Sequence, residues 1–374
     1  MAAVAPQLVV IKFPGDVRAA AIFGPGSSEK DLKPFQKNSD ATWLIGMPAS
    51  PKQADAILIF GGDGTVHRHL EQLAKLQLPV LVVPRGSGND FARALNLKKV
   101  RDAVGAWRKF GSGEDNVRAI DLGVITSYVA DPELLKLGPS PTSICDANEA
   151  AEGAGKADSS RLKPFGMTRA QQPLARVKAV NFVLTEAPEV EVGSGQSCTS
   201  DLHYFCCVVG VGLDADIARR ANKLPRWLRA HGGYALTLPQ ALLHFASFPM
   251  KVSIPDTAQP HRFVQRSAKP TILAAFANTP SYGGGMKIAP QAKLDDGRLD
   301  ICLITDIDKL KLFCLFPTVY FGRHLSIPEV EYFQTSALRV ETEHPLDVYA
   351  DGEYVCQTPV EVGVAKAALR VIVL

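Results

Sequence analysis

The chain has 374 residues, which is too long for one ordinary core and fits two domains. Hydrophobic residues make up 46% of it and charged residues 21%, a composition typical of globular proteins. The formal net charge is only +3, so bulk charge gives no reason to expect a nucleic-acid partner, and we exclude one.

The cysteines and the hydropathy of the chain indicate in which cellular compartment the protein works. The seven cysteines form no C-x-x-C pair, which argues against a disulfide framework and a zinc ribbon and favours a reducing compartment. No apolar run reaches the length of about 18 residues that a membrane-spanning helix needs. We therefore expect a cytoplasmic protein that meets a membrane, if at all, as a peripheral partner.

The first third alternates strand and helix signals. Apolar runs at 20–23, 41–46, 54–60 and 78–84 predict strands, and a helix is expected to begin at Val66 and another after residue 89. Apolar runs separated by helices are typical of parallel strands that are covered on both faces. We expect residues 1–124 to form a doubly wound α/β domain that binds a nucleotide.

The remainder, 125–374, has a different character. Short strand patterns with turn signals between them predict a mainly antiparallel β domain, interrupted by helical stretches near 214–247 and 308–323. Residues 127–200 are rich in Ala, Ser, Gly and Pro and predict a flexible insertion.

A glycine-rich turn, "GGDGT" at 61–65, joins the third predicted strand to its helix. Glycines let the backbone approach a ligand closely, and N–H groups at a helix start attract a phosphate. Asp63 would repel a phosphate unless it binds Mg²⁺, a ribose or an amine. The alternative is a tight turn in which Asp63 caps the helix.

A second loop, "PRGSGNDFARAL" at 84–95, follows the next strand, and a third, "FGPGSS" at 23–28, follows the first. All three would meet at the carboxyl ends of parallel strands, where open α/β sheets bind ligands. Neither G-x-x-x-x-G-K-[ST] nor G-x-G-x-x-G occurs in these loops, which disfavours a P-loop and a classical dinucleotide fold.

Five motifs in order, "GGDGTV", "PRGSGNDFARAL", "AIDLG" (119–123), "KLDDGRLDI" (293–301) and "DGE" (351–353), resemble the diacylglycerol kinase catalytic-domain family. That family includes bacterial lipid kinases and sphingosine kinases, and NAD kinases share its GGDGT motif and a similar fold. The resemblance implies transfer of the γ-phosphate of ATP to a lipid hydroxyl, that of a diacylglycerol or a sphingoid base, in a cleft between the two domains.

The resemblance also implies roles for individual residues. Asp351 would be the general base, and Asp90 and Asp121 would belong to an acidic network linked to Mg²⁺. Asp296, with the carbonyl groups of Lys293 and Arg298, would hold a structural Mg²⁺. The complete set assigned to the nucleotide comprises Gly61, Gly62, Asp63, Gly64, Thr65, Gly86, Ser87, Asn89, Asp90, Asp121 and Glu353.

Local patterns leave alternatives open. The pair Asp351-Gly352 is also the strongest signal for a two-residue hairpin turn, and Asp296-Gly297 is also a turn signal. His67, where the family often carries Asn, is expected on the polar face of its helix. The basic stretch at 219–234, with Arg226, Trp227 and Arg229, is either a solvated segment or a membrane contact.

Two other functions compete with the lipid kinase. One is a soluble kinase of the NAD-kinase type, and the other is a catalytically silent regulator that binds nucleotide or lipid. An apolar pocket in the second domain would favour a lipid substrate. The sequence leaves a homodimer open.

Overall fold

The computed structural model describes residues 17–37, 41–128, 202–224, 237, 239–242, 246–259 and 261–374. The expected insertion lies outside these ranges except for its first two residues, and so do Arg226, Trp227 and Arg229. No helix within the described ranges is long and apolar enough to cross a bilayer.

The first part is a parallel sheet with the order β2 (Thr42–Ile45), β1 (Arg18–Phe23), β3 (Ala56–Gly61) and β4 (Val80–Pro84). Every residue of β3 and β4 is buried, as expected for strands that are covered on both faces. This confirms the predicted doubly wound sheet, and the bounds of its strands differ from the expected ones by at most two residues.

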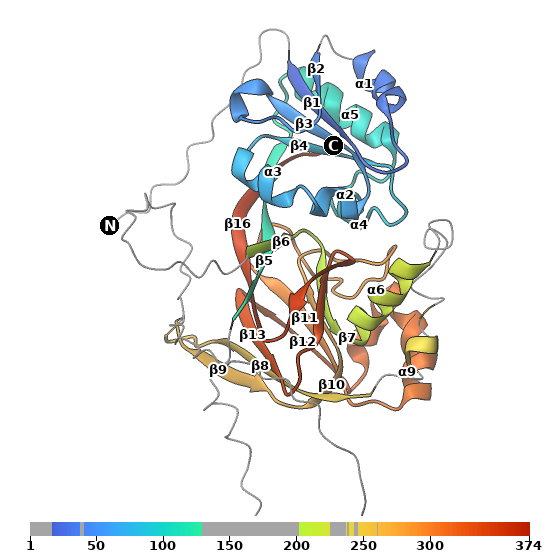
Figure 1. Ribbon diagram of the computed structural model, residues 1–374, viewed down its shortest axis with the longest axis vertical. Helices are drawn as coiled ribbons and strands as arrows, with labels where there is room; N and C mark the ends of the chain where they lie inside the picture. The colour runs from blue at the N-terminus through green and yellow to red at the C-terminus, as the bar shows by residue number, and fades with distance from the viewer. Residues whose placement is uncertain are drawn as a thin grey trace, which may run out of the picture. The chain divides into compact units, whose positions relative to one another are not determined.

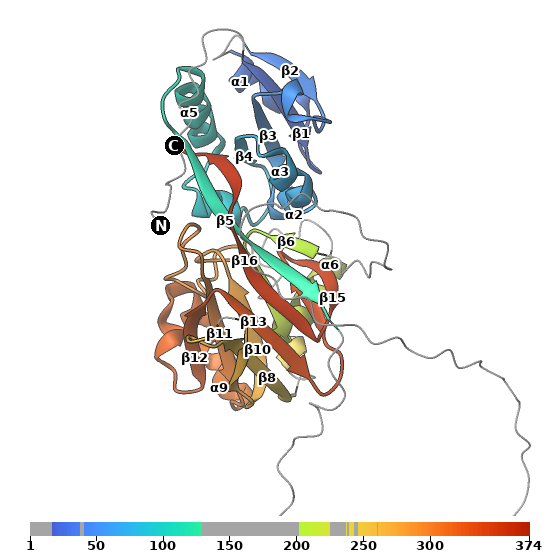
Figure 2. The same cartoon turned by 90° about the vertical axis from the view of Figure 1, so that its left-hand side faces the viewer.

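Helices cover both faces of this sheet (Figure 2). The short α1 (Lys33–Gln36) and the long α5 (Val100–Gly111) lie on one face, where Trp107 of α5 packs on Trp43 of β2. On the other face lie α2 (Asp63–His67) and α3 (Leu70–Leu76). The helix after β3 therefore begins at Asp63 rather than at the predicted Val66, directly after Gly62.

Two long strands extend from this sheet into the second part of the molecule (Figure 1). β5 (Val117–Ser127) and β16 (Val360–Ile372) pair antiparallel, and β16 also adds to the parallel sheet beside β4. Their ladder is interrupted between Ala365 and Leu369, where Ala367 has a left-handed backbone. β5 thus spans residues 124 and 125, and the boundary between the two domains remains a prediction.

The second part is a sandwich of two antiparallel layers, which confirms the predicted β architecture. One layer has the order β9 (Phe263–Ser267), β8 (Phe248–Pro255), β13 (Ala337–Thr342), β16, β5 and β6 (Leu202–Phe205). The other has the order β15 (Glu353–Gln357), β14 (Asp347–Ala350), β7 (Val208–Gly212), β10 (Pro270–Ala277), β11 (Leu299–Thr305) and β12 (Val330–Thr335). Alternate side chains of both layers form one core, including Val209, Val211, Ile301, Leu303, Leu338, Val340, Val360 and Val362.

Both helical segments predicted in the second part contain an α-helix, and the second of them differs from the prediction. The first contains α6 (Leu213–Lys223), and much of the rest of 214–247 is outside the described ranges. The second contains α9 (Lys309–Leu315), followed by the 3₁₀ turns η4 (Phe316–Phe321) and η5 (Arg323–Ser326). Pro317 explains the change, because it has no N–H group with which to continue the α-helix.

Candidate active site

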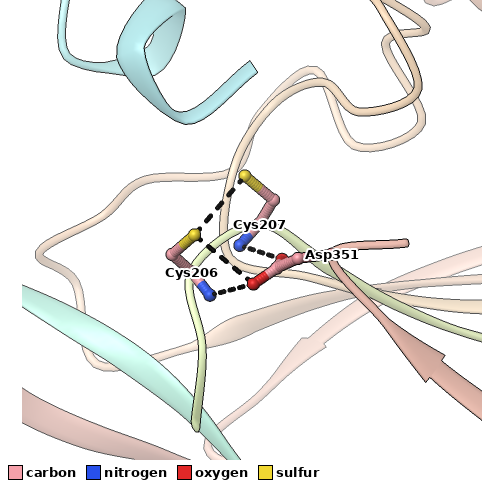
Figure 3. Close-up of side chains that lie close together, drawn as sticks. All are labelled: Cys206, Cys207 and Asp351. Atoms are coloured by element: carbon pink, nitrogen blue, oxygen red, sulfur yellow. Dashed lines mark hydrogen bonds between the residues drawn. The ribbon is translucent and has the colours of Figure 1, made fainter. Parts of the chain in front are cut away.

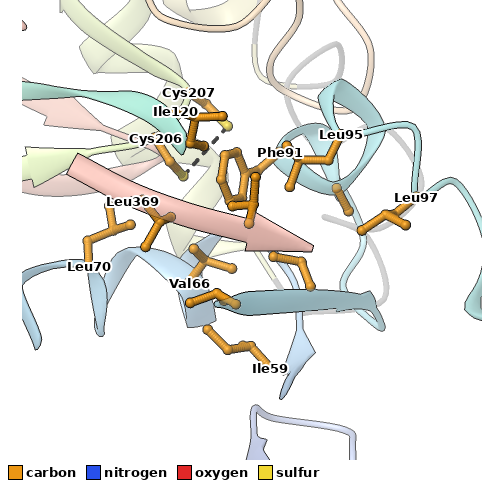
Figure 4. Close-up of a cluster of buried hydrophobic side chains, with 14 of the residues drawn as sticks. Ile59, Val66, Leu70, Phe91, Leu95, Leu97, Ile120, Cys206, Cys207 and Leu369 are labelled. Carbon is orange, nitrogen blue, oxygen red and sulfur yellow. Dashed lines mark hydrogen bonds between the residues drawn. The ribbon is translucent and has the colours of Figure 1, made fainter. Parts of the chain in front are cut away.

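The side chain of Thr65 packs closely against the backbone of the first glycine-rich loop. A Cβ atom on Gly61 would lie 2.5 Å from Thr65 Oγ1, and one on Gly24 would lie 2.2 Å from the same atom. The buried Thr65 side chain therefore fills the space between the ends of β1 and β3. Val66 of α2 and Phe91 of α4 (Asp90–Ala94) are fully buried and anchor both glycine-rich loops to the core (Figure 4).

The second loop is closed on itself by Asn89. Its side-chain oxygen accepts the N–H of Gly86 at 2.8 Å, and its amide nitrogen donates to the carbonyl of Gly86 at 2.6 Å. Asn89 has φ of 54°, a left-handed conformation that Asn tolerates better than most residues. Asn89 is thus a loop-building residue and does not line the pocket described below.

Asp63 links the two loops. Its carboxylate accepts the N–H groups of Asp90 and Phe91, both at 3.0 Å, so it caps α4 rather than its own helix. Burial, and then the charge of Asp90, raises the pKa of Asp63 to about 6, although the two N–H groups lower it. Two carboxylates therefore lie close together at the ends of β3 and β4.

Asp90 connects the second loop with a third segment that sequence reasoning missed. Its carboxylate pairs with Arg93 and accepts the N–H of Gly284 at 2.7 Å. Gly283, Gly284 and Gly285 all have positive φ, between 58° and 111°. The run "SYGGG" at 281–285 resembles the glycine-rich loops at 61–65 and 86–88, and this is the signal that would have identified it.

Asp351 occupies the turn between β14 and β15, and both turn residues have positive φ, 51° for Asp351 and 85° for Gly352. The structure thus bears out the hairpin interpretation of this pair. The Asp351 side chain has no exposed surface. It is surrounded by donors: the N–H groups of Cys206, Cys207 and Val208 at 2.9, 2.7 and 3.2 Å, the Cys206 thiol at 3.4 Å, and His67 Nδ1 at 3.0 Å.

These donors control the ionisation of Asp351. Burial alone would raise the pKa of Asp351, but the hydrogen bond and charge of His67 and the N–H groups of Cys206 and Cys207 outweigh it and lower this pKa. Asp351 is therefore held as a carboxylate.

The sequence placed His67 on a polar helix face, and the structure corrects this. Its side chain is 14% exposed and reaches Asp351, which lies 284 residues further along the chain. Helical periodicity within 63–73 carries no information about a contact so distant in sequence.

The two cysteines beside Asp351 form a compact cluster with it (Figure 3). The sulfur atoms lie 3.9 Å apart, and both residues are buried. Burial raises the pKa of Cys206 well above its usual value. The hydrogen bond with Cys206 lowers the pKa of Cys207, but burial and the charge of Asp351 outweigh it and raise this pKa to about 12. Neutral thiols are poor metal ligands, so the cluster is best described as a hydrogen-bonded cradle for Asp351.

A polar cavity of about 470 Å³ collects most of the predicted residues. Its walls include Gly62, Asp63, Gly64, Thr65, Gly86, Ser87, Asp90, Asp351 and Glu353, all of which the sequence assigned. They also include Arg68, Arg85 and Tyr282, which it did not. Of the third loop, only Pro25 reaches the wall, because the Ser27 hydroxyl donates to the carbonyls of Gly24 and Phe60.

Asp121 lies elsewhere, among the buried residues of β5. Its carboxylate accepts the N–H of Gly297 at 2.7 Å and the N–H of Ala367 at 2.8 Å. It therefore ties the 293–298 loop to the interruption in β16, and it does not line the polar cavity.

The loop at 293–298, which the sequence predicts to hold a structural Mg²⁺, has the geometry of a turn. Asp296 is exposed and accepts the N–H of Arg298 at 3.0 Å, and Gly297 has φ of 69°. Lys293 and Arg298 are exposed as well, so a metal at these three residues remains a prediction.

A second, apolar cavity of about 60 Å³ lies within the sandwich part. Its walls come from α6, β10, α9 and η4 and include Ile217, Leu273, Leu312, Leu315, Phe316 and Val319. Tyr282 lines both cavities, and its hydroxyl donates a hydrogen bond to the buried Asp214. Burial raises the pKa of Asp214 to about 6, although the hydrogen bond from Tyr282 lowers it. A polar and an apolar cavity thus share one wall.

Two family models match the chain. The model of the diacylglycerol kinase catalytic domain matches residues 25–125, and that of the YegS C-terminal NAD kinase β-sandwich-like domain matches residues 207–373. A diacylglycerol kinase of Mycobacterium tuberculosis is 27% identical over 334 residues, which cover 89% of this chain and 81% of that protein.

Solved structures support the same architecture. The crystal structure of a diacylglycerol kinase from Bacillus anthracis matches with a TM-score of 0.54 over 96% of this chain and 97% of that one. At 15% identity this likeness shows the fold alone. The family models identify a diacylglycerol kinase catalytic domain at 25–125 and a YegS C-terminal NAD kinase β-sandwich-like domain at 207–373.

Proposed function

We propose that the protein is an ATP- and Mg²⁺-dependent lipid kinase that phosphorylates a lipid hydroxyl, such as that of a diacylglycerol or a sphingoid base. Residues 1–124 would bind the nucleotide and residues 125–374 the lipid. The main observation behind this proposal is that Tyr282 lines both the polar and the apolar cavity, so that the two cavities are adjacent. Relatives that are named as diacylglycerol or lipid kinases support the same activity.

The polar cavity suits the phosphates of ATP. Gly62, Gly64 and Ser87 line it without bulky side chains, so a phosphate chain is able to approach the backbone. Arg68 and Arg85 add positive charge at the same wall. Phosphoryl transfer depends mainly on such positioning and charge neutralisation.

The donor set at the two loops fits Mg²⁺. A Cβ atom on Gly88 would lie 2.9 Å from Asp63 Oδ2 and 3.3 Å from Asp90 Oδ2, so both carboxylates border the same small space. Carboxylate oxygens are hard ligands of the kind that Mg²⁺ prefers. Asp63 and Asp90 would hold the ion, and the ion, when bound, would neutralise phosphate charge.

The apolar cavity supports a lipid acceptor over a polar one. Its walls are nearly all aliphatic or aromatic, and the ionisable side chains among them are those of Asp214, Tyr282 and His324. An NAD-kinase-type acceptor would leave its polar groups unpaired there. A silent regulator has no use for three buried carboxylates around one cavity, although binding alone would fit both cavities.

Two carboxylates compete for the role of proton acceptor. As the acceptor oxygen bonds to the γ-phosphorus and the bond to the bridging oxygen breaks, the hydroxyl proton must pass to a base. Asp351 is the residue that the family resemblance assigns. Asp63 also lines the cavity, but it would serve as the base only if Asp90 held the ion without it, because a bound Mg²⁺ lowers the pKa of its carboxylate ligands.

The test is transfer of label from γ-labelled ATP, with Mg²⁺, to diacylglycerol, to sphingosine and to NAD in parallel. We expect a labelled lipid, and a loss of about 10²- to 10⁴-fold in kcat for Asp351→Asn if this residue is the base. Asp63→Asn tests the competing assignment. Asp347→Asn is the matched control, because Asp347 lies on β14 but does not line either cavity.

The outcomes separate the three functions. Labelled lipid supports the proposal and identifies the acceptor. Labelled NAD would replace it with the NAD-kinase type, and bound ATP without any transfer would replace it with the regulator.

A further inference from the structure

His67 and Asp351 form a pair that joins α2 to the β14–β15 turn. His67 Nδ1 lies 3.0 Å from Asp351 Oδ2, and the side chains are 14% and 0% exposed. The polar cavity is lined by Asp351 but not by His67. His67 is joined to the cavity wall through its hydrogen bond to Asp351.

The donors around Asp351 are of two kinds. Three are backbone N–H groups of Cys206, Cys207 and Val208, whose positions are fixed by the start of β7, and one is a neutral thiol. His67 is the remaining donor, and it is the one that is able to carry a positive charge. Removing it would leave a buried carboxylate with neutral partners, and neutral donors stabilise a carboxylate less than a charged one does.

Other charged groups surround this pair. The pKa of His67 is lowered by burial, but the hydrogen bond and charge of Asp351, with the charge of Glu353, raise it above its ordinary value, while Arg68 opposes them. Asp351 in turn contributes to the raised pKa of Asp63. When His67 is protonated, its charge offsets the crowding of Asp63, Asp351 and Glu353.

We propose that His67 is a positioning residue for phosphoryl transfer, which fixes the Asp351 carboxylate in its turn and keeps it ionised. This inference rests on the proposed function and deepens it. We assign His67 no proton from the acceptor, because it is not among the residues that line the polar cavity. Its effect is on the proton affinity and orientation of Asp351, the base that the family resemblance assigns.

The first measurement is an NMR titration of the His67 side chain in the full-length protein, which needs no substrate. We expect an imidazole pKa above 6.5 that falls by roughly one pH unit in Asp351→Asn, because an opposite charge within hydrogen-bonding distance is lost. An unchanged His67 titration in Asp351→Asn would overturn the inference, whatever the kinase assay shows.

The second measurement is the pH profile of kcat for lipid phosphorylation. In His67→Ala the acid limb should move up by roughly one pH unit, with little change in the KM for ATP. His67→Asn keeps an N–H donor near the position of Nδ1 without the charge, so it should restore much of kcat at neutral pH and show an intermediate acid limb. It also guards against a His67→Ala variant that folds poorly.

His69→Asn is the matched control. His69 is partly exposed, and its pKa is lowered by burial and by Arg68, with Gln72 as its hydrogen-bond partner. Its profile should equal that of the wild type. If the pH profile of kcat for His67→Ala also equals that of the wild type, the His67–Asp351 pair has only a structural role and the proposed positioning role is wrong. Absence of any lipid phosphorylation would overturn the proposed function and the kinetic role together, and the NMR titration would still report on the pair separately.

Discussion

Gly62 and Gly86 approach each other so closely that neither has room for a side chain. A Cβ atom on Gly62 would lie 2.7 Å from the Cα of Gly86, and one on Gly86 would lie 2.4 Å from the Cα of Gly62. The obstacle in each case is backbone, which is unable to move aside as a side chain does. This contact sets the spacing of the two loops at the ends of β3 and β4.

We therefore expect Gly86→Ala to separate the loops. Overpacking of this kind costs about 1–3 kcal/mol, and a comparable loss of nucleotide binding would raise the KM for ATP by roughly tenfold or more. ATP titration and thermal unfolding check both effects. Gly111→Ala is the control, because a Cβ atom there meets no heavy atom within 4 Å, and both variants behaving alike would contradict the prediction.

The apolar cavity gives a prediction about the acceptor. Leu315→Trp should fill part of the 60 Å³ space and raise the KM for a long-chain lipid about tenfold, while the KM for ATP stays unchanged. Short-chain lipids should be affected less, since they need less of the cavity. Leu44→Trp provides the same change at an exposed position on β2. Equal effects on both substrates would mean that Leu315→Trp disturbs the fold rather than an acceptor site.

Much of the fold followed from the sequence because burial on both faces leaves continuous apolar runs. The strands at 56–61 and 80–84 are such runs, and each leads into a glycine-rich loop at the expected edge of the sheet. Residues 125–374 were predicted as a mainly antiparallel β domain without the order of its strands, because the pairing of antiparallel strands depends on contacts far apart in sequence. The return of β16 to the parallel sheet is such a contact.

The site was predictable where one loop supplies the residues. Gly62, Gly64, Gly86 and Ser87 came from local motifs and line the cavity together. His67 was misjudged because its partner, Asp351, is 284 residues away. The sequence likewise gave no signal that Asp63 caps the helix of the next loop, since that contact exists only after β3 and β4 have paired.

Three exposed apolar side chains lie on the segment that walls the apolar cavity. Leu310, Phe313 and Phe321 are 70%, 47% and 74% exposed, whereas Leu312 and Val319 between them line the cavity. We expect this face to contact the membrane from which the lipid comes, because it places apolar groups at the cavity wall. Replacing all three with Ser should reduce the fraction of protein that sediments with vesicles.

The matched control replaces Leu44 and Ile45 with Ser, since both are exposed apolar residues on β2. Activity on a lipid dispersed below its critical micelle concentration should be the same in all three proteins. Equal vesicle binding by the triple variant and the wild type would show that the membrane contact lies elsewhere.

The His67–Asp351 pair also predicts how stability depends on pH. The folded-state pKa of His67 is raised, so its contribution is fully present below the unfolded value of 6.5 and is lost as the pH rises through the raised value. The folded-state pKa of Asp351 is lowered, so its contribution is present above 3.8 and is lost as the pH falls through the lowered value. The contribution of the pair to the free energy of unfolding should therefore be largest between pH 3.8 and 6.5.

Denaturant unfolding of His67→Ala and the wild type at pH 5.5 and pH 9 measures this dependence. The loss of stability should be greater at pH 5.5 by about 1 kcal/mol, the usual difference between a hydrogen bond with a charged partner and one with a neutral partner. Arg18→Ala removes the ion pair with Asp55, in which the two side chains are 50% and 22% exposed, and should cause the same small loss of stability at both pH values. The same loss for His67→Ala at both pH values would mean that His67 stabilises the fold by packing and not through the charge of Asp351.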